Sequence, residues 1–142
     1  MKYVPIEVSR EFKVAHLRVT AIPVNHIVPT IGLLVTDGKS TVAFSSDTAS
    51  TTQFWKLVND AKRLDALFIE ASFPNSMHQL AEASKHLTPE TLSQELTKLN
   101  HNGMDILAVH IKPAYRDAVI SELKALGIDK LTVMEAGRRY SW

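Results

Sequence analysis

Three side chains of the kinds that bind metal ions or transfer protons come after apolar segments of the sequence. Asp47 follows one such segment, Glu70 follows Ala66–Ile69, and His110 follows Ile106–Val109. In α/β sheets, ligands bind at the carboxyl ends of the strands. Taken singly, Asp47 fits a helix N-cap, Glu70 a solvated loop acid, and His110 a satisfied buried histidine. Occurring together at three strand ends, they predict a site.

The segments around these residues predict an α/β fold in a single domain covering residues 1–142. One or two strands are expected over 12–24, and strands at 30–35 and 41–46 flank the hairpin signal Asp37-Gly38. Buried strands follow at 66–69, 106–109 and 131–134, and helices are expected over 52–63, from Thr88-Pro89 to just before Gly103, and over 114–126. This alternation is typical of a layered α/β sheet.

The predicted sheet is apolar on both faces. The runs 31–35, 66–69 and 106–109 show no polar alternation, and a sheet of this kind needs cover on both sides. Three helices are enough for one side only. We therefore expect a second copy of the chain, or another polypeptide, to supply the missing layer.

Three short motifs then occur in a fixed order. They are Ile69-Glu70-Ala71-Ser72-Phe73-Pro74-Asn75, His86-Leu87-Thr88-Pro89 and His110-Ile111-Lys112-Pro113. In this order they resemble the C-terminal half of the class II cyclic-nucleotide phosphodiesterases, a branch of the metallo-β-lactamase fold that is also similar to the tRNA 3′-processing nucleases. Phe44-Ser45-Ser46-Asp47-Thr48 resembles the aspartate motif of that superfamily, with serine in place of the usual glycine.

The resemblance implies one half of a metallo-β-lactamase-type αββα sandwich, built as a mixed sheet with helices on one face. It also implies hydrolysis of a small phosphodiester, such as the 3′,5′-cyclic nucleotide cyclic AMP, with the help of two divalent cations. Such cations polarise the phosphodiester and lower the pKa of a water molecule. Zinc is the natural occupant of a site made of histidine and aspartate, with manganese or iron as alternatives.

The same resemblance assigns roles to four residues. Asp47 corresponds to the aspartate that bridges the two metal ions, and His110 to a histidine ligand of the second metal. His86 corresponds to a histidine that contacts the phosphate or protonates the leaving oxygen. Glu70 would orient His86.

Three further residues are candidate substrate contacts. His26, in the segment leading to the Gly32 strand, either lines the pocket or has a structural role. Thr88 is expected mainly to cap its helix, and Lys112 is either a phosphate contact or a solvated lysine. The remaining histidines are expected at the surface: His16, His78 and His101.

The main metal-binding motif of the resembled family, His-x-His-x-Asp-His, does not occur in the sequence. Asp47 and His110 supply two protein ligands at most, whereas a catalytic zinc usually has three. We therefore expect weak or absent metal binding in the chain alone. A homodimer, or a missing N-terminal half, is the expected partner.

Composition limits the other functions. With 16 Lys and Arg against 15 Asp and Glu the net charge is +1, so long nucleic acid is not an expected partner. The same balance counts against an RNA-processing nuclease fragment. Cysteine is absent, which excludes disulfides and thiolate metal ligands. No segment approaches the ~20 apolar residues of a membrane span or resembles a signal peptide. A cytoplasmic protein without a membrane partner is expected.

Two functions remain open. The first is a metal-dependent phosphodiester hydrolase present as an incomplete half. The second is a non-catalytic half-domain that kept the fold and an oligomerisation surface. Metal content measured together with turnover separates them.

Overall fold

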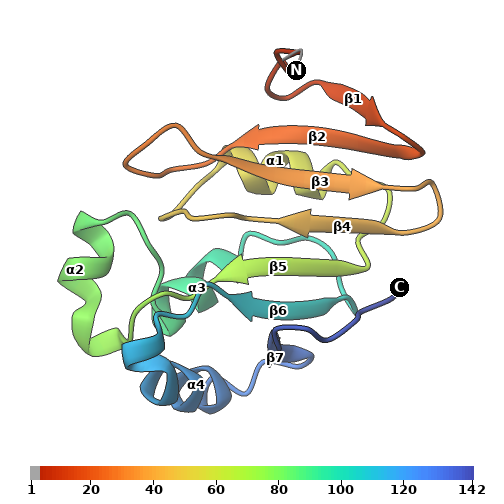
Figure 1. Ribbon diagram of the computed structural model, residues 1–142. Coiled ribbons are helices and arrows are strands. Elements are labelled where there is room, and N and C mark those ends of the chain that lie inside the picture. Colours follow the sequence, from red (N-terminus) through yellow and green to blue (C-terminus); the bar gives the residue numbers. More distant parts are fainter. Residues whose placement is uncertain (1–3) are drawn as a thin grey trace.

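The computed structural model describes residues 4–142, which form one seven-stranded sheet flanked by helices (Figure 1). The strands lie in the sheet in their order along the chain: β1 (Glu11–Val14), β2 (Leu17–Pro23), β3 (Ile31–Thr36), β4 (Thr41–Phe44), β5 (Ala66–Glu70), β6 (Asp105–Val109) and β7 (Leu131–Val133). The pairs from β1 to β4 are antiparallel and those from β4 to β7 are parallel. The predicted mixed sheet is therefore confirmed.

Helices make the crossovers that parallel strands require. They are α1 (Gln53–Asn59), α2 (His78–Ala83), α3 (Pro89–Leu96) and α4 (Arg116–Ala125), with 3₁₀ turns η1 (Asn75–Met77) and η2 (Pro113–Tyr115). As predicted, Thr88 caps α3 and Pro89 opens it. The sequence did not predict α2, which buries only Ala81 and so lacks an apolar stripe. Within residues 4–142, no helix is long and apolar enough to cross a membrane.

One face of the sheet carries the core. Phe54 and Val58 of α1, Leu92 of α3 and Val119 of α4 are all fully buried, and they belong to one cluster with Leu67 of β5. In Figure 1, α1 and α3 lie behind the sheet. These contacts fix the crossover helices, and with them the loops at the carboxyl ends of the parallel strands.

A buried acid also fixes α3. The Glu95 carboxylate accepts hydrogen bonds from Trp55 Nε1 (2.7 Å), Thr51 N (3.1 Å) and Lys98 Nζ (2.6 Å). Burial raises the pKa of Glu95, but the hydrogen bonds from Lys98 and Trp55 outweigh it and hold that pKa below its ordinary value. Because Trp55 belongs to α1, this carboxylate clamps the two helices together.

No helix in the described part of the chain covers the other face of the sheet, here called the open face (Figure 1). Apolar side chains of β3, β4 and β5 lie on this face. Val35 pairs with Val42, and the Phe44 ring stacks on Phe68 with 4.7 Å between centroids. All four residues are half-buried. The expectation of helices on one face only is confirmed.

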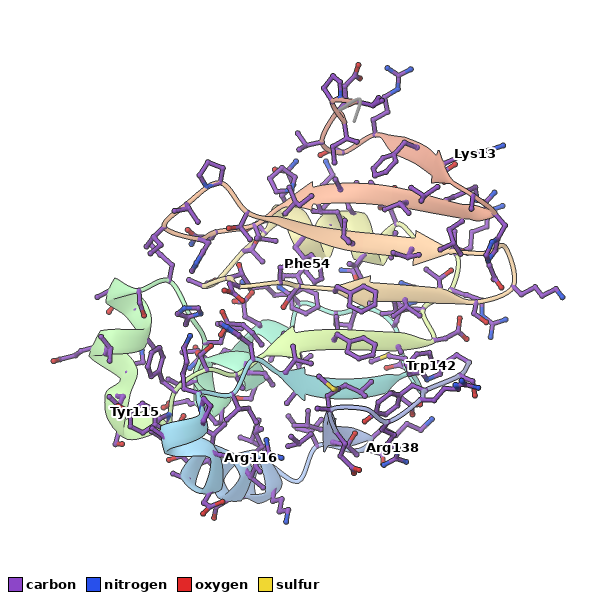
Figure 2. All side chains as sticks on the ribbon, viewed as in Figure 1. Lys13, Phe54, Tyr115, Arg116, Arg138 and Trp142 are labelled. Atoms are coloured by element: carbon purple, nitrogen blue, oxygen red, sulfur yellow. The ribbon has the colours of Figure 1, made fainter. Side chains whose placement is uncertain are left out.

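Part of the open face is covered by the C-terminal tail, residues 137–142. Tyr140 and Trp142 pack edge-on against Phe68, with ring centroids 6.3 and 5.8 Å away. Trp142 Nε1 donates to Asp105 Oδ2 at 2.7 Å, and the Ser40 hydroxyl donates to the Trp142 carbonyl oxygen at 2.7 Å. Figure 2 shows Trp142 beside the right-hand ends of β5 and β6.

Gly32 of β3 lies against the Phe44 backbone of β4 and the Phe54 ring of α1, and there is no room for a side chain. A Cβ atom at this position would lie 2.7 Å from the Phe44 carbonyl oxygen and 3.1 Å from two ring carbons of Phe54. We predict that Gly32→Ala lowers the free energy of unfolding by about 1–3 kcal/mol, because a backbone oxygen inside the sheet cannot turn away. Urea denaturation measures the change. An unaltered midpoint would contradict the close approach of the two strands.

Candidate functional site

The candidate residues gather at the carboxyl edge of the parallel strands, on the left of Figure 1. Asp47 lies in the loop after β4, Glu70 is the last residue of β5, and His110 follows β6 directly. His26 lies in the loop after β2, and His86 lies in the segment that leads into α3. The structure thus brings together residues that are up to 84 positions apart in the sequence, from 26 to 110.

Glu70 is the most enclosed member of the group, with no exposed surface. Its Oε1 accepts from Thr48 N (2.8 Å) and contacts His86 Nδ1 (2.8 Å). Its Oε2 accepts from the Ser72 hydroxyl (2.7 Å) and from Leu87 N (3.1 Å). An ionised carboxylate has about four acceptor positions, so Glu70 is saturated inside the protein and acts on its neighbours rather than on a ligand.

Two histidines of the group have their Nδ1 atoms engaged. His86 Nδ1 faces Glu70 Oε1, as above, and His26 Nδ1 lies 3.1 Å from the Lys85 carbonyl oxygen. Both partners are acceptors only, so each imidazole must present an Nδ1–H, and the Nε2 lone pair stays available. This is the arrangement by which carboxylates and carbonyls orient metal-binding histidines in proteins.

The loop that carries His26 is tied to the loop that carries Asp47. Asn25 N donates to the Thr48 hydroxyl oxygen at 3.1 Å, and Ala49 N donates to the Asn25 carbonyl oxygen at 2.8 Å. Because Asn25 and Thr48 each adjoin one of the two candidates, these bonds fix His26 beside Asp47.

Asp47 lies close to three histidines. Its Oδ1 is 3.0 Å from His110 Nδ1, and both side chains are more than a third exposed. One potential donor atom from each of His26, Asp47 and His86 falls within a group whose atoms all lie within 4.8 Å of one another. A second such group contains Glu70, His86 and His110. Imidazole and carboxylate donors at this spacing suit a divalent transition metal, so the residues present fit a metal ion.

Comparison with known proteins places the chain in a family. A family model described as "Beta-lactamase superfamily domain" matches residues 1–111. The chain belongs to the beta-lactamase superfamily. No curated protein matches the sequence significantly. The named superfamily agrees with the resemblance at the level of the fold, whereas a cyclic-nucleotide phosphodiesterase remains a proposal.

Solved structures share this beta-lactamase superfamily fold at low sequence identity. The metallo-beta-lactamase fold protein YhfI from Bacillus subtilis is 17% identical with a TM-score of 0.78, and the match covers 96% of this chain and 54% of that one. Human short-form tRNase Z is 18% identical (TM-score 0.65; 87% and 42% covered). A diphosphatase of the PhnP family is 16% identical (TM-score 0.67; 91% and 44% covered). The chain therefore spans about half the length of these proteins.

Two of the expected substrate contacts, Thr88 and Lys112, lie outside the group formed by Asp47, Glu70 and the histidines. Thr88 is fully buried, and its hydroxyl accepts from Thr91 N at 3.3 Å in the capping box of α3. Lys112 places its ammonium group 5.9 Å from the centre of the Phe73 ring, and that ring lies 5.8 Å from His86. Thr88 is thus committed to the helix, whereas Lys112 borders the group.

The histidines expected at the surface do not all lie there. His16 and His78 are exposed, but His101 is half-buried and its Nε2 lies 3.0 Å from the Val58 carbonyl oxygen. His101 therefore joins the loop after α3 to the end of α1, a contact with no local sequence signal.

Sequence reasoning also missed Ser72, which is fully buried in the loop after β5. Its hydroxyl oxygen lies within hydrogen-bonding distance of Glu70, His86 and His110. The residue was visible in the motif that contains Glu70, but only the fold shows that its side chain reaches both histidines.

Ser46, immediately before Asp47, has a φ of +53°. This left-handed conformation costs a residue with a Cβ roughly 1–2 kcal/mol and costs glycine little. The requirement explains why glycine commonly occupies this position in the aspartate motif that the sequence resembles. His110 has a φ of +58°, so a second candidate also sits on strained backbone; such strain often clusters at functional sites.

We predict that Ser46→Gly raises the free energy of unfolding by about 0.5–1 kcal/mol, which is the relief of strain less the greater entropy that glycine has in the unfolded chain. Ser46 is exposed, so little packing is lost. Urea denaturation tests this. Ser76→Gly is the matched control, because Ser76 is also exposed but has no positive φ, and it should lose stability. Equal losses in both variants would contradict the assignment of strain to Ser46.

Proposed function

We propose that this group is part of the active site of a metal-dependent phosphodiester hydrolase. The observation that carries the proposal is the convergence of His26 and His86 on Asp47, with the Nδ1 atom of each imidazole held by an acceptor. Convergent, pre-oriented ligand atoms of this kind are expected of a metal centre.

Asp47 would be the shared ligand of the proposed centre, because its carboxylate lies close to His26 and to His110. His26 and His110 would then be the flanking ligands. When bound, the metal supplies polarisation of the phosphodiester and an acidified water. This assignment moves His26 from pocket lining to metal binding and keeps Asp47 and His110 as ligands.

His86 is then available for proton transfer. Its side chain is 9% exposed, and its Nδ1–H is held by Glu70. The Nε2 atom can carry a proton to the leaving oxygen of the phosphodiester, as a general acid does. Glu70 acts on the reaction only through His86, by fixing the orientation of the ring.

A small anionic substrate suits this edge of the sheet better than a polymer. The net charge of +1 offers no extended basic surface, and Lys112 supplies a local cation beside Phe73 and His86. A 3′,5′-cyclic nucleotide or a related small phosphodiester is therefore the proposed substrate. Zinc is the proposed metal, with manganese and iron as alternatives.

Metal content and turnover test the proposal together. We predict that Asp47→Ala and His26→Ala each weaken zinc binding at least about tenfold, since loss of an outer-shell partner alone already has that effect. Equilibrium dialysis against zinc or manganese measures binding, and hydrolysis of bis-p-nitrophenyl phosphate and cyclic AMP measures turnover. His16→Ala is the control, because His16 is exposed and lies in the turn between β1 and β2.

Measurable metal binding that is equal in all four proteins would contradict the metal centre. Stoichiometric metal that depends on Asp47, without turnover of either compound, would instead support the second function, a non-catalytic half-domain. That alternative is favoured by one observation of its own, the half-buried apolar side chains of the open face.

The open face adjoins the site. Phe68 and Glu70 are two residues apart on β5, so their side chains leave the strand on the same side. A layer that packs over Phe68 would therefore end next to the metal-binding group and could contribute further ligands to it. We propose that the isolated chain covers this face with a second copy, sheet against sheet about a two-fold axis.

We predict a dimer in sedimentation velocity at micromolar concentrations, dissociated by Val42→Glu. Val42 is half-buried on the open face, and a carboxylate there would be buried unpaired in the interface. Lys56→Glu is the control, because Lys56 is exposed on α1, the helix side of the sheet. An unmodified chain that sediments as a monomer would contradict the proposed pairing, whatever its metal content.

A further inference from the structure

The structure assigns a positioning role to Ser72: its hydroxyl holds His110 in the tautomer that leaves Nε2 free, and it joins His110 to Glu70 and His86 in one hydrogen-bonded unit. This inference names a positioning residue for the proposed metal site, so it rests on the proposed function. Its test needs neither a metal nor turnover.

The Ser72 hydroxyl has four polar neighbours within 3.3 Å. Its Oγ lies 2.7 Å from Glu70 Oε2, 3.1 Å from His110 Nδ1 and 3.3 Å from His86 Nδ1. The His110 carbonyl oxygen is a further neighbour at 3.2 Å. The side chain that makes these contacts has no exposed surface, so water does not compete for them.

The direction of each bond follows from the number of hydrogens available. A serine hydroxyl has one hydrogen to donate and can accept two. Glu70 Oε2 is the closest acceptor and belongs to a carboxylate, so the hydroxyl hydrogen points there. The Ser72 oxygen is then left to accept, and His110 Nδ1 must carry a hydrogen to donate to it.

His86 reaches the same tautomer by a different route. Its Nδ1 lies 2.8 Å from Glu70 Oε1 and 3.3 Å from the Ser72 oxygen, so its hydrogen goes to the carboxylate. Glu70 therefore orients His86 directly and orients His110 through Ser72. One buried carboxylate sets the tautomer of both rings.

The backbone of Ser72 fixes the same two segments. Its N–H donates to the Leu87 carbonyl oxygen at 2.9 Å, and its carbonyl oxygen accepts from Lys112 N at 3.1 Å. Leu87 follows His86, and Lys112 lies two residues after His110. The hydroxyl is thus anchored independently of the rings that it orients.

Asp47 is the competing partner of His110. Its Oδ1 lies 3.0 Å from His110 Nδ1, but the Asp47 side chain is 37% exposed, whereas Ser72 is fully buried. The His110 Nδ1 hydrogen lies within reach of both acceptors, and a bond to either one fixes the same tautomer. Ser72 supplies a partner for that hydrogen which does not depend on Asp47.

The test removes the competing partner first. Long-range ¹H–¹⁵N spectra of the histidine side chains report which ring nitrogen carries hydrogen. They are recorded without added metal, about two pH units above the ordinary histidine pKa of ~6.5. We expect His110 to stay in the Nδ1–H form in Asp47→Ala and to change toward the Nε2–H form in the double variant Asp47→Ala/Ser72→Ala. His86 should keep its Nδ1–H form in both.

The double variant Asp47→Ala/Ser72→Thr is the conservative control, since threonine keeps the hydroxyl, and it should restore the Nδ1–H form of His110. Loss of that form in Asp47→Ala alone, or its survival in Asp47→Ala/Ser72→Ala, would overturn the inference. If Ser72 were purely structural, its replacement would lower stability without changing the tautomer of His110. Because metal and substrate are absent from the measurement, its outcome is separate from that of the metal-binding and turnover assays.

Discussion

The hydrogen bonding of Glu70 is the interaction on which the arrangement of the carboxyl edge depends. Taking a carboxylate out of water costs several kcal/mol, and the cost is tolerable because each acceptor position has a donor. The donors come from three stretches of chain: Thr48 after β4, Ser72 after β5, and His86 with Leu87 before α3. Glu70 thereby gives these three stretches one shared anchor, in addition to the backbone bonds that Ser72 makes to Leu87 and Lys112. The positions of Asp47 and His110 follow from it.

Local signals in the sequence predicted much of this fold. Asp37-Gly38 and Thr88-Pro89 each determine a turn or a helix start through the backbone of adjacent residues, and the structure has both. The apolar runs likewise predicted the parallel strands, because a buried strand can be recognised from adjacent residues alone. The sequence did not predict α2, whose short, exposed helix has no apolar periodicity. Nor could it place His26 beside Asp47. That proximity comes from the bonds of Asn25 to Thr48 and Ala49, which lie over 20 positions further along the chain.

Within residues 4–142, helices cover one face of the sheet and leave the other without a helix. On the helix side, Phe54, Leu92 and Val119 close a core that excludes water. On the open face, within residues 4–142, Phe44 stacks on Phe68 without a covering helix, and the tail packs against Phe68. Because strand alternation sends Glu70 to the same side as Phe68, the incomplete layer and the candidate site border each other. Geometry therefore links the proposed pairing of sheets to the proposed site, since a layer packed over Phe68 would end beside Glu70.

The tail gives the molecule a built-in optical reporter. The chain has two tryptophans: Trp55 is 3% exposed in the core, whereas Trp142 is 38% exposed on the open face. Any layer that settles on that face must either shield the Trp142 indole from water or displace the tail and expose it further, while the surroundings of Trp55 stay constant. The intrinsic fluorescence spectrum would shift to the blue in the first case and to the red in the second. Coverage of the sheet can thus be followed in unlabelled protein.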